Sequence, residues 1–325
     1  MPSKKNKPIV FLFGPTASGK TELAINIADK FPIELISVDS VMVYKDCNIG
    51  SAKPTKEVLK EYPHHMIDIV SPNEVFTVAD FCSFSKELIK SAHSKKKLPV
   101  FVGGSMMYFK SLFEGIHDLP KRDEKYRKEL KELKLNSNNH NFLFDMLKDI
   151  DCDYAKKINK NDEVRIIRAL EVFMITGKQI SKILSEESNN KLSNDYEISQ
   201  FAITHDRELL HKRIESRLDK IIEEGMLEEA EYLLKKYNID PEHPLRKSVN
   251  YKQAFNYLNN EYKYDDFYKK ALYATRQLAK RQITWLRSWK KFKEIKINQE
   301  DNLENSIKNL ISCLLYTSPS PRDVS

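Results

Sequence analysis

The sequence predicts an α/β fold in which helices flank a parallel sheet and a helical insertion interrupts the chain. Apolar segments of strand length alternate with segments of helical periodicity over the first third of the chain, the pattern of a parallel sheet covered on both faces. From residue 114 to residue 200, charged helical runs replace this alternation. We therefore expect residues 1–113 and 201–313 to form one discontinuous core and residues 114–200 to form an insertion domain. Residues 314–325, which contain a Ser-Pro-Ser-Pro run, are expected to be a non-native, disordered tail.

The predicted strands are short apolar runs, and the predicted helices repeat apolar residues every three or four positions. The apolar runs predict strands at residues 9–13, 33–38, 64–70, 99–102 and 201–204. The helical periodicity predicts helices at residues 21–30, 79–94, 106–113 and 227–237. A further helix is expected after a cap at Asp206, and Gly225 is expected to end it. Its apolar stripe consists of Leu210, Ile214, Leu218 and Ile222.

The segment between the first predicted strand and helix fits the phosphate-binding pattern G-x-x-x-x-G-K-[ST]. Glycines let the backbone turn its N–H groups toward oxyanions, and the helix N-terminus adds about half a positive charge. Lys20 is placed to reach a terminal phosphate, and the Thr21 hydroxyl is placed to bind Mg²⁺. The fold class is therefore P-loop NTPase-like, with a di- or triphosphate as ligand. The residues expected to bind the diphosphate are Gly14, Pro15, Thr16, Ala17, Ser18, Gly19, Lys20 and Thr21.

Asp39 directly follows the second predicted strand, at the edge of a parallel sheet where ligands bind. A carboxylate at this place either helps to hold Mg²⁺, as in P-loop ATPases, or acts as a general base. The strand at 99–102 is followed by Gly103, Gly104 and Ser105 and not by an acid. The sequence also lacks the H-R-D, D-F-G and H-E-x-x-H patterns of kinases and metalloproteases. Both roles of Asp39 stay open at this point.

Composition and charge favour an anionic partner. The 325 residues carry a formal net charge of +7, and residues 268–293 contain no acidic residue. This stretch interleaves lysines and arginines with Tyr273, Trp285 and Trp289, which predicts a basic helix suited to a polyanion. Four scattered cysteines disfavour a zinc site and a disulfide framework, so a cytoplasmic location is expected. No apolar run is long enough to span a membrane, and we expect a monomer without a membrane partner.

Six segments together closely resemble the bacterial tRNA dimethylallyltransferase family, also called IPP transferases. The segments are residues 14–21, 36–44, 46–54, 63–69, 102–109 and 274–287, and the resemblance extends from about residue 8 to about residue 298. The last segment is specific, because generic P-loop kinases lack it. The resemblance implies transfer of the dimethylallyl group from dimethylallyl diphosphate to N6 of adenosine 37. This base lies beside the anticodon of tRNAs that read codons beginning with U.

Residue roles follow from this resemblance and not from spacing. It implies that the P-loop, Mg²⁺ on Thr21, Arg213 and Arg217 hold the diphosphate leaving group. Asp39 would take or orient the N6 proton of an adenine flipped into a channel. The implied catalytic residues are Lys20, Asp39, Ser105 and Arg217. The implied tRNA-binding residues are Asp39, Ser40, Val41, Met42, Ser105, Arg165, Arg168, Lys247, Tyr251, Lys252, Lys280 and Arg281. The insertion would grip the anticodon stem-loop, although arginine pairs on helices are by themselves most simply read as solvated surface.

The sequence departs from the family pattern at three places. Ser105 stands where the family usually has Thr, and Met42 where it commonly has Gln or a small residue. Asn250 stands where the family has Gly, and Asn tolerates positive φ, so we expect the turn to survive. The alternatives are a free-adenylate dimethylallyltransferase, a P-loop small-molecule kinase and a non-catalytic RNA-binding protein. The first needs neither a helical insertion nor a basic C-terminal helix, and the last does not need Lys20, Asp39 and Ser105.

Overall fold

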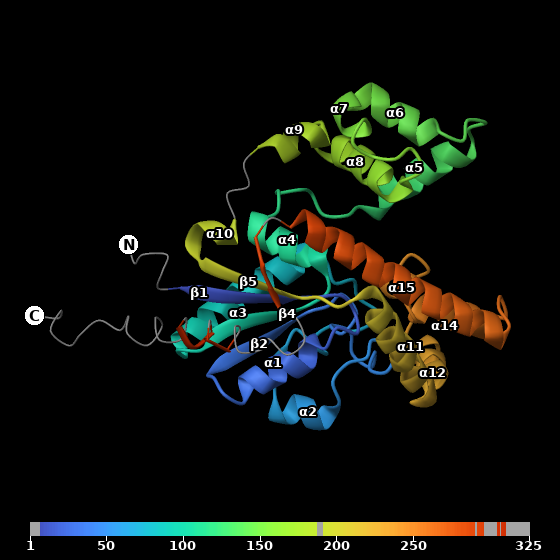
Figure 1. The fold of residues 1–325 in the computed structure, drawn as a ribbon. Helices are drawn as coiled ribbons and strands as arrows, with labels where there is room; N and C mark the ends of the chain where they lie inside the picture. The colour runs from blue at the N-terminus through green and yellow to red at the C-terminus, as the bar shows by residue number, and fades with distance from the viewer. Residues whose placement is uncertain (1–6, 187–190, 290, 296–303, 306, 310–325) are drawn as a thin grey trace, which may run out of the picture. The chain divides into compact units, whose positions relative to one another are not determined.

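The computed structural model describes residues 7–186, 191–289, 291–295, 304–305 and 307–309 (Figure 1). The predicted tail at 314–325 lies outside these residues. Internal contacts divide the chain into two compact units. The core unit consists of Met1–Phe113 and Leu192–Ser325, and the insertion unit of Glu114–Lys191.

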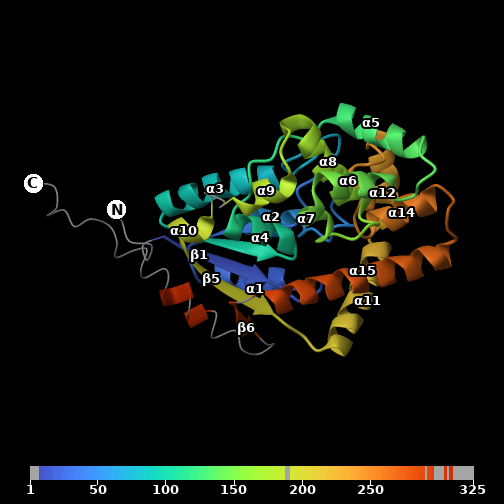
Figure 2. The same cartoon turned by 90° about the horizontal axis from the view of Figure 1, so that it is seen from above.

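The core unit is built on a parallel sheet with the strand order β3-β2-β4-β1-β5-β6, in which every pairing is parallel. Figure 2 labels three neighbouring strands of this sheet, β1, β5 and β6. The strands are β1 (Pro8–Phe13), β2 (Ile33–Val38), β3 (His64–His65), β4 (Leu98–Gly103), β5 (Glu197–Ile203) and β6 (Lys293–Ile295). This six-stranded parallel sheet flanked by helices confirms the predicted fold class. Because all strands run the same way, β1, β2 and β4 deliver the residues that follow them to one edge of the sheet.

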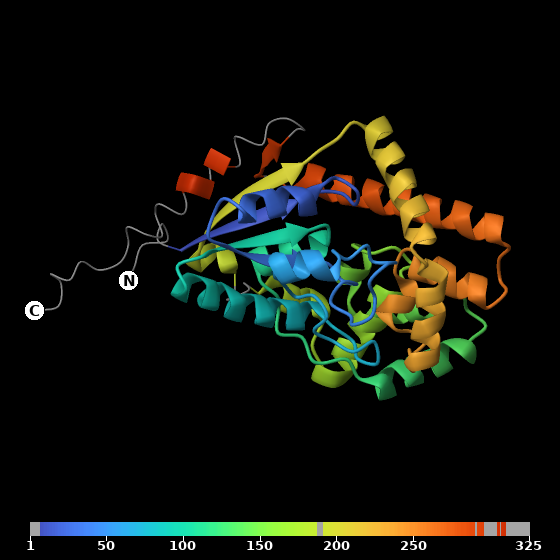
Figure 3. The ribbon, with the colours of Figure 1, turned by 90° about the horizontal axis from the view of Figure 1, so that it is seen from below.

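Ten helices with both ends in the described residues begin in the core unit, and residues 304–305 and 307–309 are also helical. The ten are α1 (Lys20–Ala28), α2 (Lys56–Glu61), α3 (Val78–Ser94), α4 (Met106–Glu114), α10 (Leu192–Asp195), α11 (Arg207–Glu223), α12 (Met226–Lys236), α13 (Pro244–Lys247), α14 (Tyr251–Leu258) and α15 (Tyr264–Ser288). Helix α11 starts beyond the carboxyl end of β5, and the long α15 runs beside it (Figure 3). These two helices therefore reach the edge of the sheet where ligands are expected.

Strand β1 is buried along its whole length because helices cover both faces of the sheet. On one face, Val10 and Leu12 belong to a core that includes the buried residues of α1. On the other face, Phe11 and Phe13 pack on the Phe109 ring of α4, with centroid distances of 5.1 and 4.6 Å. Ring contacts of this kind and full burial fix the end of β1 firmly. The loop that starts at Gly14 therefore rests on a rigid base.

Three predicted elements differ from the structure. Strand β3 ends at His65 and not at residue 70, because Met66 and Asp68 adopt φ values of 66° and 56°, outside the extended region. Strand β5 begins at Glu197 and not at residue 201. The apolar pattern predicted only its second half, because its first half is not buried and contains polar residues. The basic stretch predicted as one helix over 268–293 is helical only to Ser288, the end of α15, and β6 follows.

The apolar stripe of α11 was also wrong at one position. The buried residues are Leu210, Ile214, Leu218 and Ile221, whereas Ile222 is only partly buried. The i, i+3 step at the last turn keeps Ile221 on the core side of the helix.

The insertion unit has a hydrophobic core of its own, formed among its helices. These are α5 (Glu124–Leu135), α6 (Phe142–Ile150), α7 (Cys152–Ala155), α8 (Glu163–Thr176) and α9 (Ile180–Ser185). Leu130, Leu147 and Leu170 are among its fully or almost fully buried residues. A separate core is what a unit needs to keep its own fold.

Candidate active site

The phosphate-binding loop lies between β1 and α1, as the sequence predicts. Gly19, at the N-cap of α1, has φ 85°, a conformation that residues with a side chain rarely adopt. The Lys20 ammonium folds back over the loop and donates to the Pro15 carbonyl oxygen at 2.6 Å and to Ser18 Oγ at 3.4 Å. The lysine is therefore held above the loop, where it can approach a phosphate.

The loop forms one wall of a cavity of about 460 Å³. Elements from across the core unit complete it, namely the segments after β2 and β4 and one face each of α11 and α15. The cavity brings together eleven of the residues singled out by sequence: Thr16, Lys20, Thr21, Asp39, Ser40, Val41, Met42, Ser105, Arg217, Lys247 and Arg281. Asp39 is the one carboxylate among the described residues that line it.

Two cations face this single carboxylate. Burial and, second to it, the nearby Arg217 guanidinium lower the pKa of Lys20 to about 7, although Asp39 acts in the opposite direction. Burial also lowers the pKa of Arg217, again against the influence of Asp39. Desolvated cations placed side by side favour binding of a multiply charged anion, because its negative charge replaces the stabilisation that the cations lose when water is removed.

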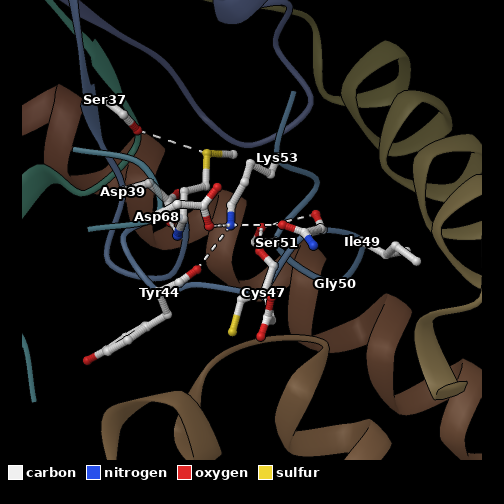
Figure 4. Close-up of polar contacts among 12 residues, drawn as sticks. Ser37, Asp39, Tyr44, Cys47, Ile49, Gly50, Ser51, Lys53 and Asp68 are labelled. Carbon is white, nitrogen blue, oxygen red and sulfur yellow. Dashed lines mark hydrogen bonds and ion pairs between the residues drawn. The ribbon is translucent and has the colours of Figure 1, made fainter. Parts of the chain in front are cut away.

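Asp39 is fixed by the chain that follows it. Its Oδ1 accepts hydrogen bonds from the Val41 and Met42 amides at 2.8 and 3.1 Å. The Met42 sulfur lies 3.9 Å from Ser37 Oγ, in the same group of contacts (Figure 4). The departure at Met42 thus keeps a polar contact to β2, and the second carboxylate oxygen of Asp39 makes no described hydrogen bond.

The loop after Asp39 closes around a buried ammonium group (Figure 4). Only 2% of the Lys53 side chain is exposed, and its Nζ donates to Tyr44 O at 3.0 Å, Asn48 Oδ1 at 3.1 Å and Asp68 Oδ1 at 2.6 Å. All three protons of the ammonium therefore have an acceptor. A buried charge satisfied in this way rigidifies the segment around it.

A carboxylate from α12 holds the same loop from the other side. Glu229 accepts the Asn48 and Ile49 amides at 2.8 Å each and the Gly50 amide at 2.9 Å, and the Tyr251 hydroxyl donates to it at 2.6 Å. A Cβ on Gly50 would lie 2.7 Å from the Tyr251 ring, so only glycine fits there. Glu229 thereby fixes the wall of the cavity formed by residues 50–52.

Tyr251 was expected to bind tRNA, and the structure gives it another environment. Its side chain is fully buried, and burial raises its pKa well above the usual value. It supports the 48–50 loop through Glu229, so a direct contact with a polymer at the surface does not fit this arrangement.

The neighbours of Tyr251 in the sequence have different environments. Lys252 is exposed, and Lys247 lines the cavity while pairing with Glu242 at 2.8 Å. Asn250 adopts φ 73°, as its place at a glycine position predicts.

The two arginines of α11 occupy different places. Arg217 lines the cavity, and its Nη2 lies 3.5 Å from the Ala52 carbonyl oxygen. Arg213 donates from Nε to the Ala17 carbonyl oxygen at 2.8 Å and is not among the residues that line the cavity. Arg213 therefore braces the phosphate-binding loop, whereas Arg217 is free to face a ligand.

Helix α15 presents two faces. Arg281, Gln282 and Trp285 line the cavity, while Lys280 lines a second cavity of about 550 Å³ together with Arg207, Arg276 and Arg287. Lys280 and Arg281, both expected to contact tRNA, thus point to different cavities. Three of the six basic residues of α15, Arg276, Lys280 and Arg287, line the second cavity.

The two insertion-unit arginines singled out by sequence, Arg165 and Arg168, also have different environments. Arg168 donates to Glu171 Oε2 at 2.5 Å and to the Pro120 carbonyl oxygen at 2.6 Å. Burial alone would raise the pKa of the fully buried Glu171, but hydrogen bonds from Arg127 and Arg168 outweigh it and lower that pKa. Arg165 is different, since 62% of its side chain is exposed and its contact is an ion pair with Asp162 at 3.3 Å. Of the two, Arg165 is the more exposed, since 26% of the Arg168 side chain is exposed.

Three polar residues of the site were missed by sequence reasoning: His64, Glu229 and Gln282. His64 lines the cavity, its Nδ1 lies 2.7 Å from the Tyr62 carbonyl oxygen, and its buried Nε2 has no described partner. Gln282 lies on the buried stripe of α15, among alanines and leucines. A polar residue in an apolar helical stripe was the available signal for Gln282, whereas nothing local marks Glu229.

Two further observations concern metals and membranes. Among the described residues, no cluster of three or more His, Cys, Asp or Glu side chains could hold a metal ion. No helix in the described part of the chain is long and apolar enough to cross a membrane.

Comparison with known proteins assigns this architecture to a family. The model described as IPP transferase matches residues 42–289. The chain is 44% identical over 284 residues to the tRNA dimethylallyltransferase of Francisella philomiragia, covering 87% of this chain and 92% of that protein. It is 44% identical over 294 residues to the tRNA dimethylallyltransferase of Acinetobacter baumannii, covering 89% and 93%.

Two solved structures are similar over most of the chain. The full-length tRNA isopentenylpyrophosphate transferase of Bacillus halodurans matches with a TM-score of 0.68 and 30% identity, covering 95% of this chain and 98% of that chain. A eukaryotic dimethylallyltransferase described as acting on tRNA matches with a TM-score of 0.76 and 26% identity, covering 93% and 79%.

The Glu229 contacts generate a prediction about stability. Each carboxylate oxygen of Glu229 accepts two hydrogen bonds. Glu229→Gln replaces one of these oxygens by an NH₂ group, so two donors lose their acceptor and lie against another donor. We expect a loss of about 2–4 kcal/mol in the free energy of unfolding, measured by urea denaturation. The neighbouring Glu228 is exposed, and Glu228→Gln is the matched control, with a change within about 0.5 kcal/mol. Equal stability of the two variants would contradict the assignment.

Proposed function

Because the chain belongs to the IPP transferase family, we propose that it transfers the dimethylallyl group of dimethylallyl diphosphate to N6 of adenosine 37 in tRNAs that read codons beginning with U. The observation that carries this proposal is one cavity that combines a phosphate-binding loop and two desolvated cations, Lys20 and Arg217, with one carboxylate. The cations suit the leaving group, and the carboxylate suits the amine that replaces it.

The leaving group is diphosphate, whose negative charge grows as the bond to the allylic carbon breaks. Lys20 and Arg217, with amides of the phosphate-binding loop, are placed to stabilise this charge in a water-poor site. Mg²⁺ would bind the diphosphate, with the Thr21 hydroxyl as protein ligand, and would neutralise part of its charge. The scarcity of acidic side chains in the cavity fits an ion held mainly by phosphate oxygens and water.

The acceptor is an exocyclic amine that must lose a proton. As N6 attacks the allylic carbon, the C–O bond breaks, its electron pair leaves with diphosphate, and an N6 proton must be accepted. Asp39 is the carboxylate available in the cavity, and its oriented Oδ1 leaves Oδ2 for this task. Ser105 lines the same space and keeps the hydroxyl of the family's usual Thr, which can donate to a phosphate oxygen.

The RNA is held mainly by charge in this proposal. The exposed Arg165 of the insertion unit and the basic residues of α15 are suited to phosphate contacts with the anticodon stem-loop. These features favour RNA over the alternative acceptor, a free adenylate. The free thiols of Cys47, Cys82 and Cys152 fit the reducing cytoplasm expected for such an enzyme, which we propose acts as a monomer.

The test is mass spectrometry of tRNA hydrolysed after incubation with the protein, dimethylallyl diphosphate and Mg²⁺. The expected product is adenosine heavier by one dimethylallyl group, located at position 37 by sequencing of nuclease fragments. Parallel reactions with AMP as acceptor, and with labelled ATP and no prenyl donor, test the adenylate transferase and kinase alternatives. Modified AMP with unmodified tRNA would replace the proposal by the first alternative.

The pKa of Lys20 generates a prediction about binding. Above pH 7 the lysine is largely neutral in the free protein, and a bound diphosphate raises its pKa, so binding takes up a proton. Affinity for a non-reacting dimethylallyl thiolodiphosphate, with tRNA saturating, should weaken by up to about tenfold per pH unit above about 7. Calorimetry in two buffers of different ionisation enthalpy measures the uptake. Lys20→Met should abolish this component, and equal uptake in both proteins would refute it.

Asp39→Asn separates the two roles of this carboxylate. Asparagine keeps the oxygen that accepts the Val41 and Met42 amides, so the loop geometry should survive. We expect the single-turnover rate to fall by about 10²- to 10⁴-fold with tRNA affinity unchanged, because a general base is lost. A rate restored by raising Mg²⁺ would instead indicate that Asp39 helps to hold the metal.

Arg165 tests the grip on RNA. Arg165→Ala should weaken tRNA binding and flatten the slope of log affinity against log salt by roughly 0.7 to 0.9, because one phosphate contact is lost. Affinity for the thiolodiphosphate should not change. Arg168 is unsuitable for this test, since its loss leaves the buried Glu171 short of a partner. A salt slope equal to that of the parent would mean that Arg165 does not meet a phosphate.

A further inference from the structure

Gln282 connects two parts of the active site that are far apart in the sequence. Its Oε1 accepts the Thr16 amide of the phosphate-binding loop at 2.9 Å, and its Nε2 donates to the Gly104 carbonyl oxygen at 3.0 Å. Gly104 directly precedes Ser105, which lines the cavity as Thr16 does. One side chain of α15 therefore links the loop after β1 to the loop after β4.

The chemistry of these two contacts requires a carboxamide. Thr16 offers an N–H donor and Gly104 offers a carbonyl acceptor, so the bridging group needs one acceptor and one donor a fixed distance apart. A carboxylate lacks the donor, and a thioether or hydrocarbon lacks both. Gln282 is 8% exposed, so water cannot readily replace either bond.

The backbone is shaped to admit this side chain. A Cβ on Gly104 would overlap Gln282 Nε2 and would lie 3.3 Å from the Gly14 carbonyl oxygen. Glycine at this position thus leaves the space that the amide fills, between the two loops. The close approach indicates a bridge that sets a distance, because neither loop can move toward the other while Gln282 lies between them.

We propose that Gln282 is a positioning residue for prenyl transfer, which fixes the spacing between the phosphate-binding loop and the segment that carries Ser105. This inference rests on the proposed function, in which the two loops hold the leaving group on either side. Small errors in such spacing are costly, since a misplacement of about 1 Å can reduce a rate about 10²-fold.

The test compares Gln282→Met and Gln282→Glu with the same changes at Gln277. Gln277 lies on the other face of α15 and lines the second cavity, so it is a matched control on the same helix. We expect the single-turnover rate of Gln282→Met, measured at saturating tRNA, to fall about 10- to 100-fold. Under this condition a change in RNA affinity at the second cavity does not enter the rate, and both Gln277 variants should stay within about twofold of the parent. A Gln282→Met rate within twofold of the parent overturns the proposal.

Gln282→Glu gives a readout that lost stability alone would not produce. A protonated carboxyl group has one donor and one acceptor, like the amide, whereas the carboxylate repels the Gly104 carbonyl oxygen. The ratio of variant to parent rate should therefore rise as the pH falls from about 8 to about 5.5, since burial raises the pKa of such a carboxyl group. A ratio that stays flat overturns the proposal. Melting temperatures over the same pH range show whether unfolding contributes.

A final measurement does not depend on activity. Exchange of the Thr16 amide hydrogen, followed by NMR, should be faster in Gln282→Met than in the parent and unchanged in Gln277→Met. Unchanged exchange in Gln282→Met means that the bridge is absent and refutes the inference. If exchange responds but the parent does not modify tRNA, the proposed function fails while the bridge stands, and the two failures are thus told apart.

Discussion

The site depends on the burial of positive charge beside a single carboxylate. Removing Lys20 and Arg217 from water costs free energy, which the lowered pKa values of both residues express. Asp39 offsets part of this cost but cannot neutralise two cations. In the proposed function, the negative charge of a bound diphosphate neutralises the remaining positive charge. The preference for an anionic ligand therefore follows from the burial of these two cations. A site of this kind binds its anion most strongly when everything around the cations is held still.

Two charges of opposite sign, the buried Lys53 ammonium and the partly buried Glu229 carboxylate, fix the wall of the cavity formed by residues 50–52. Lys53 is the centre of the segment after Asp39 and satisfies oxygens from within it, while Glu229 captures consecutive amides of the same segment from α12. The hydrogen bond from Arg217 to the Ala52 carbonyl oxygen then joins this wall to a ligand-facing cation. Buried ionic groups are expensive unless fully bonded, and here nearly every polar atom has a partner. The consequence of this bonding is that the position of the cavity wall is fixed.

The fold and half of the site could be predicted from sequence because their signals are local. The phosphate-binding loop is a contiguous pattern, and the apolar strands beside it need no knowledge of distant residues. Nothing local marks Glu229, and the polar position of Gln282 in an apolar stripe marks the residue but not its partners, which lie in other elements. Tyr251 and Arg168, both expected at an RNA surface, are hydrogen-bonded to the carboxylates of Glu229 and Glu171. Whether a polar side chain faces solvent or a buried partner depends on tertiary packing, which spacing does not reveal.

The position after β4 explains why so much depends on Asp39. Strand β4 is the direct neighbour of β1, and P-loop ATPases place a metal-binding acid after a strand of this sheet. Here that place holds Gly103 and Gly104, and the amide of Gln282 fills the space where a side chain on Gly104 would stand. A side chain on Gly104 would overlap the Gln282 amide, so a carboxylate there and the Gln282 bridge exclude each other. The bridge from α15 and the absence of an acid after β4 are therefore linked, because the bridge occupies the space that the acid would need. In the proposed function, Asp39 at the end of β2 is therefore the carboxylate of the cavity that acts on the acceptor amine.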